Sequence, residues 1–315
     1  MSVPAGGPAE VLSVARIWDA SPHSAFTDLT RFRGRWFCCF REAAAHAQAD
    51  GRGGNGRIRV LTSADGMHFA SCAVLARRGT DLRDPKLSVT PDGRLMLLFG
   101  GTRFRGGSYT GRRPGVSFSR DGVEWGESHP VLGEGDWLWR VAWHRRRAYG
   151  VTYRLESART WSVTLVESGD GITYREVQRL AVTSKPNETT LRFRSDGEAW
   201  AIVRREGGDK QAWLGRSRPP YRDWEWRSVG MRIGGPNLLF LPDRSAIVAG
   251  RMIRGGEARM SLAVMGKGTL QSLTDLPSGG DCGYPGLVLH RGLLWVSYYS
   301  SHEGKAAIYL AAVRL

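Results

Sequence analysis

Apolar residues along this chain gather in short runs separated by polar turns, and no long stretch repeats them at helical spacing. The runs are rich in β-branched and aromatic residues and end at Gly, Pro, Asp or Asn, as strands do. Clear examples are RWFCCF (35–40), RIRVLTS (57–63), RLMLLFG (94–100), TWSVTLVES (160–168), EAWAIVRRE (198–206), SAIVAGRM (245–252) and LLWVSYYS (293–300). The best helical segment, 41–50, is short. The pattern therefore predicts an all-β protein.

One sequence element recurs along the chain: a Ser, then Asp-Gly, then an aromatic residue. It appears in TSADGMHF (62–69), FSRDGVEW (118–125) and VESGDGITY (166–174), and in degraded form in SRPPYRDWEW (217–226). The repeat has a period of about 50 residues with several strands per unit, which is typical of propeller blades. Asp tolerates left-handed backbone and Gly supplies positive φ, so we expect Asp65, Asp121 and Asp170 to be structural residues of peripheral turns.

At this period the 315 residues make a six-bladed β-propeller, or a five-bladed one with longer loops. The chain shows no linker, no low-complexity stretch and no shift in composition, which indicates one domain over 1–315. We expect the last strand to pair with N-terminal residues, because closing the ring removes exposed sheet edges.

Composition agrees with short strands joined by tight turns, since the chain has 41 Gly and 12 Trp. No run of 18 apolar residues predicts a membrane span, and the first 20 residues do not resemble a signal peptide. A cytoplasmic location is therefore expected, or a secreted or periplasmic one if the chain is a processed form. The four cysteines, at 38, 39, 72 and 282, lack metal-ligand spacing, so reduced thiols, no metal and no cofactor are expected.

The formal net charge of +15 suits an anionic partner. The basic residues are scattered, however, and RRR at 145–147 is the longest basic run. Neither a basic helix nor zinc-finger spacing is present, so neither nucleic acid nor a membrane is the expected partner. An acidic carbohydrate is consistent with the charge; the oligomeric state is open.

The repeated Ser-x-Asp-Gly-x-x-aromatic element resembles the Asp box (BNR repeat) of the sialidase superfamily, and further landmarks of sialidases follow in the same order. An Asp lies 15 residues before the first box, an Asp-Pro opens RDPKLSVTPDGRLMLLF, a Glu and an Arg stand 16 residues apart in PNETTLRFRSDGEAWAIVRRE, an Arg lies in GRMIRGG, and a Tyr lies in GGDCGYPGLVLHRG. These landmarks are Asp50, Asp84, Glu188, Arg204, Arg251 and Tyr284.

The resemblance implies an exo-acting, retaining glycoside hydrolase that cleaves a terminal sialic acid or related acidic sugar. Tyr284 would be the nucleophile, Glu188 its base and Asp50 the acid/base residue. A neutral Tyr suits a substrate whose anomeric carbon bears a carboxylate, because a carboxylate nucleophile would be repelled. Arg204 and Arg251 would bind that carboxylate and Asp84 a substrate hydroxyl.

The chain departs from the sialidase pattern at its first landmark. Sialidases begin with an Arg in an F-R-I-P-like strand, whereas the corresponding stretch, HSAFTDL (23–29), has no Arg. We expect Arg41, one strand later, to enter the pocket and replace it. Further polar residues near the first and last blades are expected to line the pocket where the chain differs from sialidases: His23, Asp28, Glu42, His46 and His302.

Other functions remain open on the sequence alone. The same blades suit a glycosidase or lyase that acts on another sugar, and a non-catalytic carbohydrate-binding propeller. If Tyr284 is only a core aromatic residue, a carboxylate pair, Glu188 with Asp50 or Asp84, becomes the better catalytic candidate.

Overall fold

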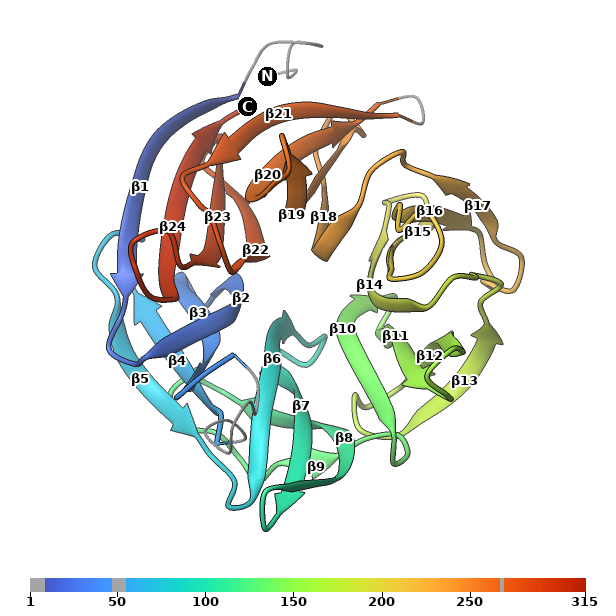
Figure 1. Cartoon of the computed structure of the whole chain (residues 1–315), viewed down its shortest axis with the longest axis horizontal. Helices are drawn as coiled ribbons and strands as arrows, with labels where there is room; N and C mark the ends of the chain where they lie inside the picture. The colour runs from blue at the N-terminus through green and yellow to red at the C-terminus, as the bar shows by residue number, and fades with distance from the viewer. Residues whose placement is uncertain (1–8, 47–54, 267–268) are drawn as a thin grey trace.

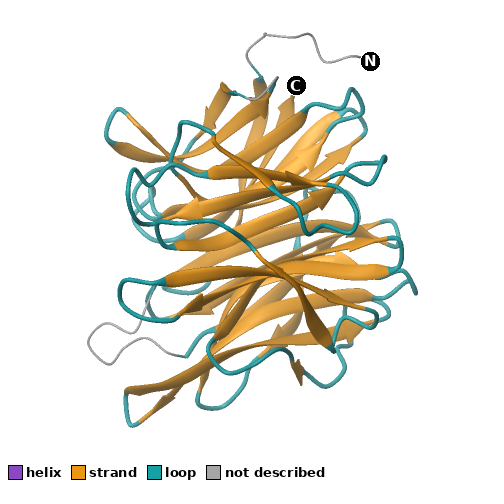
Figure 2. Cartoon of the chain, turned by 90° about the vertical axis from the view of Figure 1, so that its right-hand side faces the viewer, coloured by secondary structure: helices purple, strands orange, loops and turns teal. Residues whose placement is uncertain are grey.

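A computed structural model describes residues 9–46, 55–266 and 269–315. Within these residues the chain forms strands joined by turns and no helix, so no helix there is long and apolar enough to span a membrane (Figure 2). The strands form six four-stranded antiparallel sheets arranged around a common centre (Figure 1). The prediction of a six-bladed β-propeller is therefore confirmed.

Each of the first five blades is built from four consecutive strands, ordered from the centre outwards. Blade one is β2 (His23–Phe32), β3 (Arg35–Ala43), β4 (Arg57–Ser63) and β5 (Ala70–Leu75). Blade two is β6 (Thr80–Val89), β7 (Leu95–Arg105), β8 (Ser108–Ser119) and β9 (His129–Pro130). Blade three is β10 (Asp136–His144), β11 (Arg147–Leu155), β12 (Trp161–Ser168) and β13 (Tyr174–Arg179). Blade four is β14 (Pro186–Phe193), β15 (Ala199–Arg205), β16 (Trp213–Ser217) and β17 (Glu225–Ser228). Blade five is β18 (Ile233–Phe240), β19 (Ala246–Arg254), β20 (Glu257–Met265) and β21 (Leu270–Leu276).

The sixth blade joins the two ends of the chain. It consists of β22 (Cys282–His290), β23 (Leu293–Ser300), β24 (Ala307–Arg314) and, outermost, β1 (Glu10–Trp18). Strand β1 runs antiparallel to β24, with Glu10 opposite Arg314 and Trp18 opposite Ile308. The expected pairing of the last strand with N-terminal residues is confirmed, and it closes the ring of blades.

The inner strand of every blade carries a register shift against its neighbour, at a corresponding place in all six blades. The shifts lie between Ala25 and Asp28, Arg83 and Lys86, Leu138 and Val141, Pro186 and Thr189, Gly234 and Asn237, and Gly283 and Gly286. In four of them a residue has positive φ: Phe26, Asp84, Gly235 and Tyr284. Such bulges bend a strand and re-aim its side chains, so each inner strand turns a few residues out of the regular pleat.

Apolar side chains fill the wedges between neighbouring blades. Met96 and Leu98 of β7, for example, pack with Leu138 and Val141 of β10. Another cluster joins Phe26, Trp139 and Tyr284, which come from the inner strands of blades one, three and six. The core is therefore divided among the blade interfaces, and the inner strands lie nearest the centre.

The three intact Ser-Asp-Gly turns adopt one hydrogen-bonding pattern. In the second turn the Ser119 hydroxyl donates to the Asp121 carboxylate, which also accepts the backbone N–H groups of Val123 and Glu124. Asp65 and Asp170 make the corresponding contacts in their own turns. All three aspartates are exposed, and the central pocket described below has none of them in its wall. Their prediction as residues of peripheral turns is confirmed.

We predict that the glycine of such a turn is required for packing as well as for backbone conformation. Gly122 has φ of 81°, and a Cβ added there would lie 2.3 Å from Cε1 of Phe37 in blade one. Gly34 has a similar φ of 78° in a hairpin turn, but nothing lies within 4 Å of an added Cβ. Gly34→Ala should lower the free energy of unfolding by about 1 kcal/mol, and Gly122→Ala by about 1–3 kcal/mol more because of overpacking. Urea denaturation measures both, and equal losses would contradict the packing role.

Candidate active site

The inner strands surround a pocket of about 920 Å³ at the centre of the propeller. Four of the bulge residues line it: Phe26, Asp84, Glu188 and Tyr284. Aromatic side chains from blades two and three complete much of the wall, namely Phe104, Tyr109, Trp137 and Tyr153. The pocket therefore combines acidic and phenolic groups at the strand bulges with apolar ring surfaces beside them.

Tyr284, Glu188 and Arg204 form a compact hydrogen-bonded group in this pocket. The Tyr284 hydroxyl donates to Oε1 of Glu188 at 2.6 Å. Arg204 donates from Nη1 to Oε2 of Glu188 at 2.7 Å and to the Tyr284 oxygen at 3.1 Å. The backbone N–H of Gly235 also donates to Oε2 of Glu188. Because Glu188 and Arg204 come from blade four, Gly235 from blade five and Tyr284 from blade six, three consecutive blades must pack correctly to assemble the group.

The electrostatic environment sets the resting protonation of this pair. Burial alone would raise the pKa of Glu188, but Arg204, the Tyr284 hydroxyl and the Gly235 N–H together hold it below its usual value. Burial, reinforced by the Glu188 charge, raises the pKa of Tyr284 well above its usual value. The resting state is therefore a neutral phenol hydrogen-bonded to a carboxylate. Transfer of the phenol proton to Glu188 is uphill unless the phenolate oxygen gains a new bond at the same time.

Backbone strain and glycine contacts place the Tyr284 ring. Tyr284 has φ of 53°, a conformation that a non-glycine residue adopts only where its surroundings enforce it. Its ring lies against Gly235, where an added Cβ would come within 2.7 Å of the ring. Phe26 and Trp139 pack on it with ring centroids 5.0 and 5.5 Å away. The phenol is thus held in one orientation, with its oxygen turned to Glu188.

Asp84 is the second carboxyl group among the bulge residues that line the pocket. It has φ of 49° and lines the pocket beside Glu188. Burial raises its pKa; Lys86 and Arg83 partly oppose the shift, and the Glu188 charge adds to it. Asp84 therefore keeps a proton at higher pH than an ordinary aspartate, which is the property required of a general acid.

Two further arginines lie near Tyr284. The Arg251 guanidinium carbon is 5.9 Å from the centroid of the Tyr284 ring, and its Nη1 lies 3.5 Å from Oδ1 of Asp281. Arg83 lines the pocket, lies over the Phe26 ring and contacts Asp81 at 3.2 Å. Arg83 is partly exposed in the pocket wall, where an anionic group can reach it, and Arg251 is partly exposed beside Tyr284.

The expectation that Arg41 replaces the missing first-strand Arg is wrong. Arg41 is fully buried and binds Asp81 with two parallel hydrogen bonds, from Nε at 2.8 Å and from Nη2 at 3.0 Å. Its Nη1 donates to the carbonyl of Ala45. With all three nitrogens engaged and none in the pocket wall, Arg41 has no donor to offer a substrate carboxylate. The cation that does line the pocket on this side is Arg83.

Three other predicted pocket residues are placed elsewhere. Asp28 is buried and accepts hydrogen bonds from Arg140 of blade three and from the N–H of Leu87 in blade two. Glu42 accepts hydrogen bonds from the Trp18 indole and from Arg57, and pairs with Arg59. His302 packs on Tyr309 and contacts Ser300. These side chains satisfy structural partners and do not line the pocket. Asp50 lies outside the described residues.

The structure does bring the predicted residues His23 and His46 together. Both contact the carboxylate of Asp281, which the sequence analysis did not identify. Asp281 lies 3.1 Å from Nε2 of His23 and 2.5 Å from Nδ1 of His46. His46 also lines the central pocket. Arg83, Asp81 and Tyr299 were missed as well. A sequence signal existed for Arg83 alone, because it begins one of the inner-strand segments that recur about every 50 residues: SAFTDL, RDPKLS, WLWRVA, PNETTL, GGPNLL and GYPGLV.

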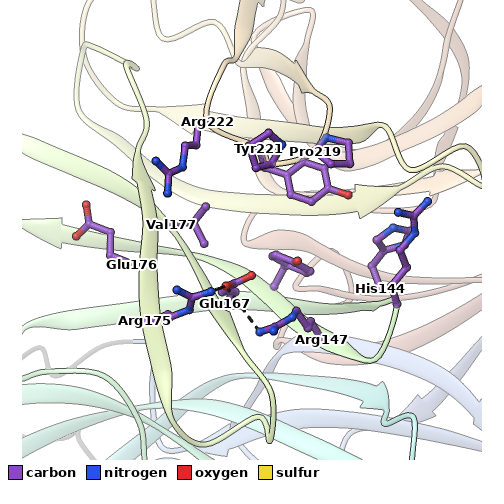
Figure 3. A pocket seen from close by; sticks show the side chains of 12 residues that line it. His144, Arg147, Glu167, Arg175, Glu176, Val177, Pro219, Tyr221 and Arg222 are labelled. Carbon is purple, nitrogen blue, oxygen red and sulfur yellow. Dashed lines mark hydrogen bonds and ion pairs between the residues drawn. The ribbon is translucent and has the colours of Figure 1, made fainter.

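A second hollow, of about 320 Å³, lies between blades three and four (Figure 3). Arginine side chains surround it, but Glu167 within it already pairs with Arg175 and Arg147. It shares no wall residue with the central pocket. Glu188, Asp84 and Tyr284, whose pKa values are displaced by burial and by one another, line the central pocket, which makes it the candidate active site.

No protein-family model matches the chain, and no curated protein matches its sequence. Solved structures do match. A protein of unknown function from Dyadobacter fermentans superposes with a TM-score of 0.83 at 18% identity, over 99% of this chain and 100% of that one. An α-L-arabinofuranosidase from Fusarium graminearum superposes with a TM-score of 0.75 at 13% identity, over 97% and 98%.

The sialidase of Trypanosoma rangeli, in complex with sialic acid, superposes with a TM-score of 0.70 at 10% identity. The match covers 97% of this chain and 57% of the sialidase chain. The fold is that of the sialidase-like propellers. This confirms the resemblance at the level of the fold, since such low identities reach no further.

We predict that Asp28 stabilises the propeller through its buried ion pair with Arg140, which joins blades one and three. Asp28→Asn leaves the Arg140 cation buried without its counter-ion and should lower the free energy of unfolding by about 3 kcal/mol. Asp19→Asn, which removes an exposed partner of Arg16, is the matched control and should cost less than about 1 kcal/mol. Urea denaturation compares the two. A mild effect of Asp28→Asn would reopen its role as a ligand-binding residue.

Proposed function

We propose that this protein is an exo-acting, retaining glycoside hydrolase in which Tyr284 is the nucleophile and Glu188 its base. The observation that carries the proposal is the 2.6 Å hydrogen bond from the Tyr284 hydroxyl to Glu188, with Arg204 contacting both groups. A scaffold has no need of a strained, buried phenol paired with a carboxylate at the wall of an open pocket. The fold shared with glycoside hydrolases supports the reaction class by analogy.

The proposed reaction has two displacements. In the first, the Tyr284 oxygen bonds to the anomeric carbon while its proton passes to Glu188, and an acid in the pocket protonates the leaving oxygen. In the second, the same acid, now a base, takes a proton from water, and the water oxygen displaces Tyr284. Glu188 then returns its proton to the phenolate. Two inversions at one carbon give net retention of configuration.

The pocket chemistry supports a carbohydrate as the substrate, and an acidic one first. Trp137 and Tyr153 offer ring faces, and Arg112 lies over both rings. Arg204 and Arg251 flank Tyr284, where a carboxylate on the anomeric carbon of a sialic-acid-like sugar would lie. A nucleophile that is neutral at rest suits such a carbon, because it meets no charge repulsion before attack.

A neutral sugar is the second candidate, and one observation favours it. Arg41 is fully engaged by Asp81 and cannot complete a sialidase-like clamp of three arginines, and Arg83, which lines the pocket on that side, already contacts Asp81. A panel of chromogenic sialosides, other 2-keto acid glycosides, uronides and arabinofuranosides separates the two candidates. Turnover of an acidic glycoside that falls sharply in Arg251→Met supports the acidic substrate; turnover of neutral glycosides alone overturns it.

We predict that Tyr284→Phe lowers kcat at least about 10⁴-fold on the substrate found, because the attacking oxygen is lost while ring packing is kept. Glu188→Gln should lower kcat by about 10²–10⁴-fold. Tyr298→Phe, at a buried tyrosine outside the pocket, is the matched control and should retain activity. Mass spectrometry of protein quenched with a 2- or 3-fluoro glycosyl fluoride should find the sugar on Tyr284. Near-normal activity of Tyr284→Phe would rule out this mechanism.

We further predict that the acid/base residue is Asp50, with Asp84 binding a substrate hydroxyl. Asp50→Ala should then slow a poor leaving group such as an alkyl glycoside at least about 10²-fold more than an activated aryl glycoside. Azide should restore its turnover, since a small anion can replace the missing base. Asp84→Asn should instead raise KM for both leaving groups alike. If Asp84→Asn slows the poor leaving group selectively and Asp50→Ala raises KM for both leaving groups alike, the acid is Asp84, whose raised pKa suits that role.

A further inference from the structure

Three potential metal ligands converge on the wall of the central pocket from distant parts of the chain. His23 is the first residue of β2, His46 follows β3, and Asp281 directly precedes β22. Nε2 of His23 lies 3.1 Å, and Nδ1 of His46 2.5 Å, from the same carboxylate oxygen, Oδ2 of Asp281. The three potential ligand atoms all lie within 4.8 Å of one another. Neither spacing nor a local turn requires this convergence, so it is a product of the tertiary fold.

The other oxygen of Asp281 is held by separate groups. Oδ1 accepts the hydroxyl of Tyr299 at 2.7 Å and lies 3.5 Å from Nη1 of Arg251. The backbone N–H of Asp281 donates to Ser301. The carboxylate is therefore fixed with Oδ2 toward the imidazoles, in the way that hydrogen bonds from neighbouring groups orient metal-binding carboxylates.

Burial and exposure divide the cluster into a closed and an open side. His23 is buried, and its Nδ1 has no hydrogen-bond partner within the described part of the chain. The His46 side chain is 47% exposed and lines the pocket. A group bound between the two rings would be anchored from the protein side and remain open to the pocket.

We propose that His23, His46 and Asp281 form a binding site for a divalent transition-metal ion, of the Zn²⁺ class, with its remaining coordination positions open to the central pocket. Two imidazole nitrogens and one carboxylate oxygen are the donor set that such ions prefer over Mg²⁺ or Ca²⁺. The 3.1 Å separation of His23 Nε2 and Asp281 Oδ2 suits two donors each about 2 Å from one ion. The 2.5 Å separation of His46 Nδ1 and Asp281 Oδ2 is too short for this, so the half-exposed His46 ring must move away from Asp281 when the ion binds. The site goes beyond the proposed glycosidase chemistry and does not depend on it.

The charges around the cluster limit where the ion binds. Arg251 approaches Asp281 from the Oδ1 side, whereas both imidazoles face Oδ2. The ion therefore occupies the side of the carboxylate away from the guanidinium. There it adds a positive charge to the pocket wall close to Phe26, whose ring lies 5.2 Å from that of His46.

The test is direct metal binding to tag-free protein dialysed against a chelator. Calorimetric titration with Zn²⁺ should give one saturable site per chain, and Co²⁺ should give visible absorption bands of a nitrogen- and oxygen-ligated ion. His46→Ala and Asp281→Asn should each weaken Zn²⁺ binding at least about tenfold. Saturating Zn²⁺ should also raise the thermal unfolding midpoint of the wild type more than that of His46→Ala.

Two variants serve as controls. His302→Ala removes a nearby histidine outside the cluster, and Cys72→Ser removes the partly exposed thiol; both should bind Zn²⁺ like the wild type. His46 is half-exposed, so His46→Ala should fold normally, which its far-UV spectrum and unfolding midpoint verify. Absence of a saturable site in the wild type, or equal affinity of the wild type and His46→Ala, overturns the proposal whatever the glycosidase assays show.

Discussion

The register shift in each innermost strand is the constraint on which the centre of this propeller depends. A bulge takes backbone carbonyls out of the sheet ladder, and they need partners because they are buried. Side chains of the neighbouring inner strand supply them. The Thr27 hydroxyl donates to the carbonyl of Tyr284, the Asn237 amide to that of Pro285, and the Thr190 hydroxyl to that of Pro236. The bulges of blades five and six are therefore stabilised by side chains of neighbouring blades, and the contact between Thr27 and Tyr284 forms only when the ring closes.

The same shift decides which side chains face the pocket. In a regular strand successive side chains point to opposite faces of the sheet, and those faces are covered here by neighbouring blades. At the bulges Asp84, Glu188 and Tyr284 leave that alternation and line the pocket. This placement requires positive φ at Asp84 and Tyr284, a backbone conformation that is strained for residues other than glycine. The candidate chemistry thus resides where the backbone is least regular.

The charged residues at the centre separate into two groups by what they contact. Arg41 with Asp81 and Asp28 with Arg140 are buried pairs that hydrogen-bond to each other within the protein. Such pairs add little to the free energy of unfolding. Each partner would be an unpaired buried charge without the other, so the pairs favour the one arrangement of blades that brings them together. Glu188, Tyr284 and Asp84 instead border open space, and their pKa values are displaced by burial and by one another. Titratable groups with shifted pKa values beside a pocket are what acid–base catalysis requires.

Local sequence determined the architecture of this protein. Short β-rich runs, Asp-Gly turns and a period of about 50 residues are local features, so they predicted all-β blades, the peripheral aspartates and the closure of the ring. The pairing of Glu188 with Tyr284 near Arg204 was predicted through the order of landmarks and agrees with the geometry. The choice of partner for Arg41 and Asp28 could not be predicted, because a buried charge binds whichever opposite charge the packing of other blades brings within reach. Arg41 pairs with Asp81 from blade two, and Asp28 pairs with Arg140 from blade three. Likewise only the closed ring places His23 and His46 of blade one beside Asp281 of blade six, more than 200 residues away in the chain.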